Sequence, residues 1–219
     1  MNIGIIGAGH IGGALVRRLT KLGHTVSIAN SRGPESLREL AQETGATPVT
    51  PPDAVRDKDV VVVTIPEKNV AALPKDLFRA ARPDTVVIDT GNYYPQRDGH
   101  IAEIESGTTE SRWVASQLQR PVVKAFNNIY AQHLLDRGKP AGAPGRIALP
   151  FAGDDARAKD VVRHLLDELG FDAVDAGTLD ESWRQQPGTP VYGSDRDADG
   201  VREALAHAMP ERPLEFRAK

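Results

Sequence analysis

The sequence predicts an α/β fold with a doubly wound, mostly parallel sheet and helices on both faces. Short apolar runs alternate with helical patterns along the chain. The run from Asp59 to Thr64 contains consecutive valines, which is typical of a strand buried on both faces of a parallel sheet. A glycine-rich turn, Gly7 to Gly12, joins the first apolar run to the first helical pattern. Together these observations favour strands and helices alternating around one sheet.

Composition limits the classes of protein that fit. A chain of 219 residues fits one large domain at ~150 residues per domain. A net charge of −3 gives no basic excess for nucleic acid, and no apolar run approaches the ~20 residues of a membrane span. With the first strand at the N-terminus and no room for a signal peptide, we expect a cytoplasmic protein with no membrane contact. Without cysteine, redox chemistry would require a bound cofactor.

The first βαβ unit is predicted within residues 2–31. Ile3 to Ile6 form a strand, Ile11 to Leu22 a helix with apolar positions three or four apart, and Thr25 to Ala29 a second strand. In the G-x-G-x-x-G turn, the glycines allow a tight turn, close approach of a pyrophosphate and packing of helix on strand, while free N–H groups at the helix start meet the phosphates. The sequence therefore predicts a Rossmann-type dinucleotide site formed by Gly7, Ala8, Gly9, His10, Ile11 and Gly12.

The second strand ends in a segment without an acidic residue. NAD enzymes usually carry Asp or Glu ~20 residues after the glycines to bind the ribose 2′-hydroxyl. This chain has Asn30, Ser31 and Arg32 there, and neutral donors with a guanidinium suit a 2′-phosphate. NADP is therefore the expected cofactor. The alternative is that Arg32 only pairs with Glu35 on the next helix.

Three later strands are expected to end at the same edge of the sheet. They are predicted at residues 59–64, 85–89 and 122–125, and open α/β sheets bind ligands at the carboxyl ends of their strands. For Asn92 and Asn127, a turn or helix cap is an equal alternative to ligand contact, because Asn is favoured in both. The residues expected at this edge are Thr64, Ile65, Pro66, Thr90, Gly91, Asn92, Ala125 and Asn127.

The same patterns predict the remaining elements. Residues 34–45 form a helix, Thr50 begins another, and 99–119 carry one or two short helices with Trp113 in the core. A strand, a helix and a strand at 146–151, 154–169 and 171–175 should add a βαβ unit to the same sheet. Residues 139–145 form a surface loop, 195–209 a final helix and 210–219 a tail. No linker separates these parts, so residues 1–219 are expected to form one domain.

The segment from Ala176 to Tyr192 places aromatic and amide side chains between prolines. Flat aromatic rings, amides that donate and accept, and restrained prolines suit the wall of a ligand site. We expect this wall on the acceptor side of the nicotinamide. The alternative is a subunit contact without a ligand role, because aromatic residues are also enriched at interfaces. The substrate-binding residues predicted here are Trp183, Gln185, Gln186, Pro187 and Tyr192.

No metal site or catalytic residue is assigned. The acidic run from Asp195 to Asp199 copies half of a calcium loop, but Ala206 stands where the bidentate Glu is needed. Acidic residues entering a helix explain the run better. The histidines lack metal-ligand spacing. Hydride transfer between two bound cofactors needs orientation more than an acid–base pair.

Several motifs together resemble the coenzyme F420-dependent NADP oxidoreductases over nearly the whole chain. They are the glycine turn, Ala29 to Gly33, Thr64 to Pro66, Lys124 to Asn127 and Ala152 to Asp155. The resemblance implies a Rossmann-type protein, often a homodimer, that passes hydride between NADPH and F420. It also implies that Ser31 and Arg32 meet the 2′-phosphate, that Thr64 to Pro66 and Ala125 to Asn127 border the nicotinamide, and that F420 lies across it. A related domain uses a flavin instead.

Two hypotheses follow from the sequence. The first is an NADPH-dependent reductase that uses F420 or another flat small-molecule acceptor such as a flavin. The second is a non-catalytic NADP(H)-binding regulator. A second flat pocket beside the nicotinamide favours the first hypothesis, whereas a nicotinamide capped by Trp183 or Tyr192 favours the second.

Overall fold

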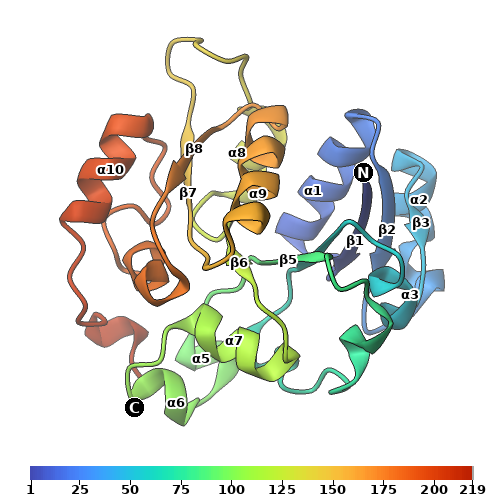
Figure 1. The fold of residues 1–219 in the computed structure, drawn as a ribbon, viewed down its shortest axis with the longest axis horizontal. Coiled ribbons are helices and arrows are strands. Elements are labelled where there is room, and N and C mark those ends of the chain that lie inside the picture. The colour runs from blue at the N-terminus through green and yellow to red at the C-terminus, as the bar shows by residue number, and fades with distance from the viewer. Residues whose placement is uncertain (219) are drawn as a thin grey trace.

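The computed structural model describes residues 1–218, and its centre is a six-stranded parallel sheet (Figure 1). The strand order is β3-β2-β1-β4-β5-β6 and every neighbouring pair is parallel. This is the doubly wound order of dinucleotide-binding folds, so the predicted fold class is confirmed. The strands are β1 Asn2–Ile6, β2 Thr25–Ala29, β3 Thr47–Pro48, β4 Val60–Val63, β5 Val86–Asp89 and β6 Val123–Lys124.

Ten α-helices and four short 3₁₀ helices connect the strands in residues 1–218. The α-helices are α1 His10–Lys21, α2 Arg38–Thr44, α3 Pro51–Val55, α4 Glu67–Val70, α5 Pro95–Asp98, α6 Ala102–Glu105, α7 Glu110–Leu118, α8 Ala131–Asp136, α9 Ala156–Glu168 and α10 Ala198–Ala206. The 3₁₀ helices are Pro34–Leu37, Leu77–Ala80, Leu179–Gln185 and Leu214–Phe216.

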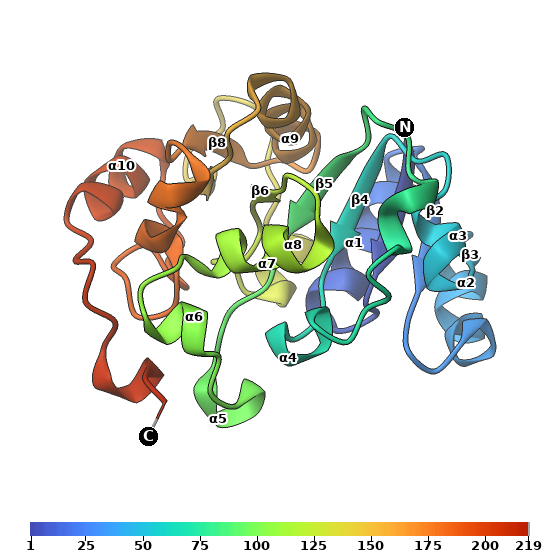
Figure 2. The same ribbon diagram turned by 60° about the horizontal axis from the view of Figure 1, so that its bottom comes forward.

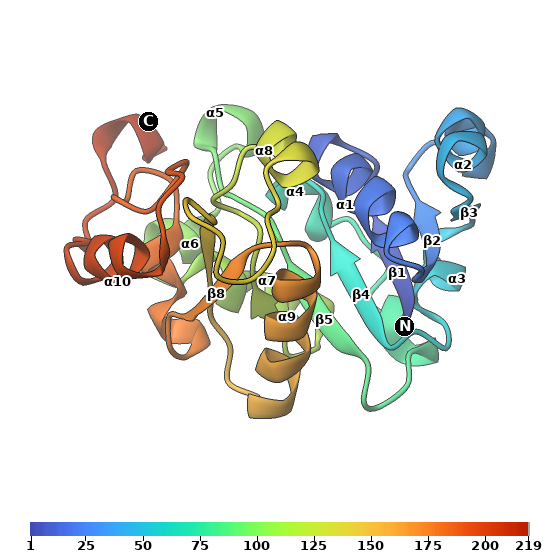
Figure 3. The same cartoon turned by 90° about the horizontal axis from the view of Figure 1, so that it is seen from above.

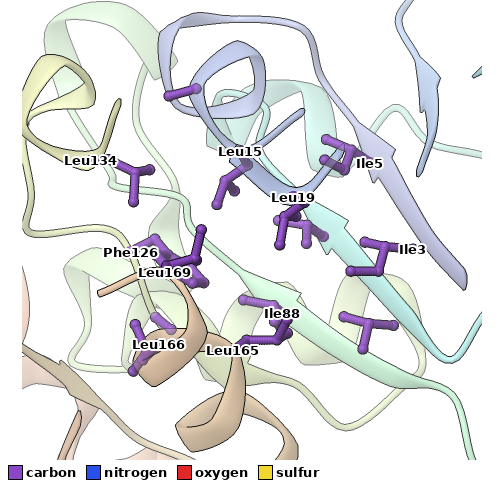
Figure 4. Packing of buried hydrophobic residues seen from close by; sticks show 14 of the residues in the cluster. Ile3, Ile5, Leu15, Leu19, Ile88, Phe126, Leu134, Leu165, Leu166 and Leu169 are labelled. Carbon is purple, nitrogen blue, oxygen red and sulfur yellow. The ribbon is translucent and has the colours of Figure 1, made fainter. Parts of the chain in front are cut away.

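Alternate residues of the strands build a core on each face of the sheet. On one face, Ile3, Ile5 and Ile88 pack with the apolar sides of α1, α8 and α9 (Figure 4). On the other face, strand valines pack with α3, α4, α6 and α7. Trp113 of α7 is buried in this second core, as predicted. Both faces of β4 are therefore covered, which explains why its sequence is valine throughout.

The two C-terminal strands do not join the main sheet, so that prediction was wrong. β7 Ala148–Phe151 and β8 Asp172–Asp175 form a separate parallel pair. One antiparallel bridge, Lys124 to Ala152, connects this pair to β6. The reason is geometric, because β6 has only two residues and β7 meets it in the opposite direction. Helix α9 packs against strands of both sheets and shares one core with them.

The elements spread along one long direction (Figures 2 and 3). Helix α10 and the β7–β8 pair lie at one end, and α2 and β3 lie at the other. The predicted final helix is shorter than 195–209, and Asp197 caps it by accepting from the N–H of Gly200 at 2.9 Å. Helix α8, helix α4 and strand β3 were not predicted. In the predicted tail, Leu214–Phe216 is helical, and Lys219 lies outside the described residues.

Candidate functional site

The carboxyl ends of β1, β4, β5 and β6 lie side by side. The first residue after each of β4, β5 and β6 donates its N–H to the carbonyl oxygen of the last residue of β1, β4 and β5, respectively. These bonds are 2.9 Å for Thr64, 3.1 Å for Thr90 and 3.1 Å for Ala125. The residues predicted for this edge are therefore brought together, with Thr64 half-buried and Ala125 fully buried.

In the glycine turn between β1 and α1, close backbone contacts leave no room for a side chain at Gly7 or at Gly12. Gly7 has φ +118°, and a Cβ on it would lie 2.2 Å from the carbonyl oxygen of Thr64. A Cβ on Gly12 would lie 2.0 Å from the carbonyl oxygen of Gly7. At Gly9 a Cβ would meet nothing within 4 Å, so this backbone is open to a ligand. Helix α1 begins at His10 without a side-chain cap, which leaves its first N–H groups available to an anion.

The loop after β2 is folded by Asn30. Its Oδ1 accepts from the backbone N–H of Arg32 at 2.9 Å, and its Nδ2 donates to the hydroxyl of Ser36 at 2.9 Å. The alternative pairing of Arg32 with Glu35 does not form, because Glu35 pairs with Arg38. Arg32 is exposed and takes part in no ion pair within residues 1–218. Its guanidinium therefore remains available to a ligand.

One hollow of ≈ 620 Å³ connects the glycine turn to this loop. It holds both the uncapped helix start and the Arg32 side chain, so two groups that attract anions face the same space. Ser31 is exposed in the same loop. The residues that line the hollow include Ala8, Gly9, His10, Arg17, Arg32 and Ser36.

Amide side chains at the ends of β5 and β6 bond to one another. Asn127 Nδ2 donates to Asn92 Oδ1 at 3.0 Å, and Asn92 Nδ2 donates to the carbonyl oxygen of Asn127 at 2.9 Å. Gln185 Nε2 donates to Asn127 Oδ1 at 2.9 Å. Neither asparagine caps a helix. The two side chains join the ends of β5 and β6, and Asn127 Nδ2 also donates to the carbonyl oxygen of Gln185 at 2.7 Å.

The predicted wall segment presents two different faces. Gln185 is fully buried in the amide network, and the hydroxyl of Tyr192 bonds to that of Tyr94. Trp183, Gln186 and Pro187 instead line a separate cavity of ≈ 940 Å³. The structure therefore places Gln185 beside the strand ends, whereas Trp183, Gln186 and Pro187 face the separate cavity.

A cluster of buried charges, not predicted from the sequence, lies at the same strand ends. Lys124 Nζ lies 3.2 Å from Asp89 Oδ2 and donates to the carbonyl oxygen of Gly91 at 2.5 Å. Glu110 Oε2 lies 3.9 Å from Lys124 Nζ, and Glu110 Oε1 accepts from Arg212 Nη2 at 2.8 Å. A detectable signal existed, because Asp89 and Lys124 are charged residues within otherwise apolar runs.

Glu67 completes this cluster with a carboxyl group that has no partner. Both of its oxygens are buried and accept no hydrogen bond within the described residues. Burial, and then the charge of Asp89, raises the pKa of Glu67 well above 4.5. Burial lowers the pKa of Lys124, but Asp89, Glu110 and Glu67 outweigh it, so that the pKa is raised overall. The two cations Lys124 and Arg212 lie next to Asp89 and Glu110, whereas Glu67 has no cation within ion-pair distance among the described residues.

Residues 1–218 contain neither a metal-binding cluster nor a helix suited to cross a membrane. No group of three or more His, Cys, Asp or Glu side chains could hold a metal ion in this part of the chain. None of its helices is both long enough and apolar enough to cross a membrane.

Comparison with known families identifies the N-terminal part of the chain. Residues 2–93 match the family model described as NADP oxidoreductase coenzyme F420-dependent. The curated protein YjhV of Escherichia coli (strain K12) is 46% identical over 87 residues, which are 40% of this chain and 56% of that protein. The match thus spans little more than half the length of this curated relative.

Two solved structures resemble the chain over most of its length. A hypothetical protein, SMa0349 from Sinorhizobium meliloti, is 31% identical with a TM-score of 0.77, and the match covers 90% of this chain and 95% of that protein. A protein from Arthrobacter sp. FB24, described as a candidate F420 dependent NADP-reductase, is 24% identical with a TM-score of 0.66. That match covers 81% of this chain and 85% of the Arthrobacter protein, and at this identity it shows the shared fold.

Proposed function

We propose that this chain, whose residues 2–93 match the family model of the coenzyme F420-dependent NADP oxidoreductases, transfers hydride between NADP(H) and a flat acceptor. The family makes it an NAD(P)-dependent oxidoreductase, and the proposal adds the acceptor, coenzyme F420 or a flavin. The observation that carries the proposal is the hollow joining the uncapped start of α1 to the free guanidinium of Arg32. A dinucleotide 2′-phosphate needs this combination of groups.

The proposed cofactor site follows the geometry of the sheet. The backbone from Gly7 to Gly12 would bind the pyrophosphate, and the loop from Asn30 to Arg32 would bind the 2′-phosphate. The nicotinamide would lie along the strand ends. The residues assigned to it by this proposal are Thr64, Ile65, Pro66, Thr90, Gly91, Asn92, Ala125 and Asn127.

The chain's contribution to the reaction would be orientation. A bound nicotinamide supplies or accepts the hydride itself. The rigid strand ends would fix the position of the nicotinamide ring. The hydrogen-bonded network of Asn92, Asn127 and Gln185 would form the protein surface against which the acceptor lies. The ring of Tyr192, whose hydroxyl bonds to that of Tyr94, would provide a flat surface beside this network.

The decisive experiment is anaerobic stopped-flow mixing of the protein and NADPH with coenzyme F420, with FMN and FAD as comparators. We expect NADPH oxidation to match reduction of one of these acceptors. Tight binding of NADPH without hydride transfer to any of them would instead support a regulator. One observation favours the regulator. The side chain of Asn127 is already bonded to the side chains of Asn92 and Gln185, so the amide groups of this network are already occupied.

The proposal also includes a homodimer located in the cytoplasm. Light scattering coupled to size-exclusion chromatography tests the dimer directly. A mass equal to one chain of 23.6 kDa would contradict it.

A further inference from the structure

We propose that the cavity covered by residues 207–217 binds a small organic anion, a carboxylate carried on an apolar ring, through Arg212 and Gln186. This site is separate from the dinucleotide hollow and does not depend on the proposed function. Its volume is ≈ 940 Å³, which falls within the range of small-molecule sites.

Apolar side chains provide surface for a ring. They come from three separate parts of the chain: α6, the 3₁₀ helix Leu179–Gln185 with the segment that follows it, and the C-terminal tail. Flat and rigid side chains bury a ring with little loss of conformational entropy. The apolar lining residues used in this argument are Ile104, Trp183, Pro187, Pro190, Met209 and Pro210.

Two lining residues have buried donors without acceptors. Gln186 is 8% exposed, and its Nε2 has no hydrogen-bond partner in the described part of the chain. Arg212 Nη1 is also buried without a partner. The two side chains are joined, because Arg212 Nη2 donates to Gln186 Oε1 at 3.2 Å. Buried donors in native proteins almost always have an acceptor, so this pair indicates an acceptor that the chain does not supply.

The chemistry of the two donors favours a carboxylate. A carboxylate has only acceptor atoms and can accept from an amide N–H and a guanidinium N–H together. The carboxylates that line the cavity do not fill this role. Asp180 accepts from Arg112 at 2.6 Å, Glu105 accepts from the N–H of Ala218 at 3.1 Å, and Glu211 is exposed.

The tail is part of the site. Both free donors are shielded from solvent in this structure, so ligand entry requires the tail beyond Arg212, residues 213–217, to move. Arg212 itself is fixed, because Nη2 donates to Glu110 Oε1 at 2.8 Å. Beyond it, Gln96 Nε2 donates to the carbonyl oxygen of Glu215 at 2.6 Å, and Phe216 packs against Tyr94 with ring centroids 6.1 Å apart. Opening of residues 213–217 would break these surface contacts and leave the Arg212–Glu110 pair in place.

The test uses a matched pair of probes, 1-naphthylacetate and the neutral 1-naphthylacetamide, in isothermal titration calorimetry with the full chain. We expect saturable binding of the acid and weaker binding of the amide. Saturating NADPH should not displace the acid. No binding of the acid, equal binding of both probes, or displacement by NADPH would overturn the proposal. The first of these results would mean that water satisfies the donors.

The variant Gln186→Glu sharpens the test. It retains an oxygen for Arg212 but replaces the free donor with an acceptor, so it should weaken binding of the acid at least about tenfold and leave the amide unaffected. Arg212→Lys keeps a positive charge near Glu110 and removes the second free donor. This variant should also weaken binding of the acid. The control is Arg202→Gln on α10, which changes the net charge by the same amount as Gln186→Glu and should not affect binding. Unchanged melting temperatures would show that the variants fold. Retained acid binding in Gln186→Glu would overturn the assignment.

Discussion

The proposed preference for NADP depends on one exposed residue in the loop after β2. Arg32 stands where an acidic residue would bind a ribose hydroxyl, and its side chain makes no ion pair within residues 1–218. A guanidinium that is not paired within the protein can offer its full hydrogen-bonding capacity to a phosphate.

We expect NADPH to bind more than about tenfold more tightly than NADH, because a charge-assisted hydrogen bond contributes about 1.5–3 kcal/mol. Arg32→Ala should remove most of this preference. Dissociation constants from calorimetry check both statements. Arg38→Ala is the matched control, since Arg38 is exposed nearby but pairs with Glu35. Equal affinities in the unmodified protein would contradict the prediction.

Glu67 gives a second prediction at the scale of one residue. Burial first, and then the charge of Asp89, raises the pKa of its carboxyl in the folded state well above its ordinary value of 4.5. The folded protein therefore retains a proton that the unfolded chain releases. The contribution of Glu67 to the free energy of unfolding is therefore fully present below pH 4.5. It is lost as the pH rises toward the pKa of Glu67 in the folded state.

Glu67→Gln should therefore stabilise the protein more as the pH increases above 4.5. The gain should approach about 1.4 kcal/mol for each pH unit between the unfolded and folded pKa values. Urea unfolding at a series of pH values measures it, with exposed Glu103→Gln as the control. A stability difference that does not change with pH would show that Glu67 is ionised in the folded protein.

The predictable part of the site was the part governed by backbone geometry and periodic pattern. Gly7 to Gly12 were recognisable from their spacing, and the structure shows the contacts that exclude side chains there. The burial of Gln185 was not predictable, because a hydrogen bond to Asn127 across 58 residues of chain leaves no local pattern. The charged cluster was missed for the same reason, since Lys124, Glu110 and Arg212 meet only after folding.

At the scale of elements, α7 ends in an unfavourable conformation. Gln119 follows the helix with φ 52°, in the left-handed region, and its N–H donates to the carbonyl oxygen of Ala115. A residue with a Cβ is disfavoured there by roughly 1–2 kcal/mol, whereas glycine is the usual choice at this position.

Gln119→Gly should stabilise the protein by about 0.5–1 kcal/mol, after subtracting the larger entropy of glycine in the unfolded chain. Gln117→Gly, inside the same helix, should instead cost about 1 kcal/mol. Denaturant unfolding of both variants provides the comparison. The same sign of change in both would show that helix propensity, rather than the left-handed conformation, determines the result.

Element types were more predictable than element partners. The strands β7 and β8 were found within a few residues of their predicted positions, but their sheet was not. Periodicity indicates which side of a strand is buried and not which strand pairs with it. The length of β6, two residues, decides the outcome, and short strands have little sequence signal.

At the scale of the molecule, one core connects the two sheets. Leu149 and Phe151 of β7 belong to the same buried cluster as Ile5 and Ile88 of the main sheet, with α9 between them. A continuous core favours cooperative unfolding of both sheets. The single domain stays a prediction, which cooperative unfolding would test.

Single-tryptophan variants can test this cooperativity. Trp183→Phe leaves Trp113 to report on the main sheet, and Trp113→Phe leaves Trp183 to report on the C-terminal part. Within each variant, the fluorescence transition in guanidinium chloride should coincide with the transition measured by far-ultraviolet circular dichroism. Separate transitions would mean two independently folding units.

The contrast between the glycine turn and Arg32 has a consequence for how such a chain can evolve. Any side chain at Gly7 or Gly12 would collide with backbone oxygen, so mutation can hardly alter the pyrophosphate cradle without unfolding it. Arg32, in contrast, is exposed and supports no core contact. If these residues bind the cofactor as proposed, descendants of this sequence can exchange one dinucleotide for another through a few surface substitutions, whereas the backbone that binds the pyrophosphate stays almost unchanged.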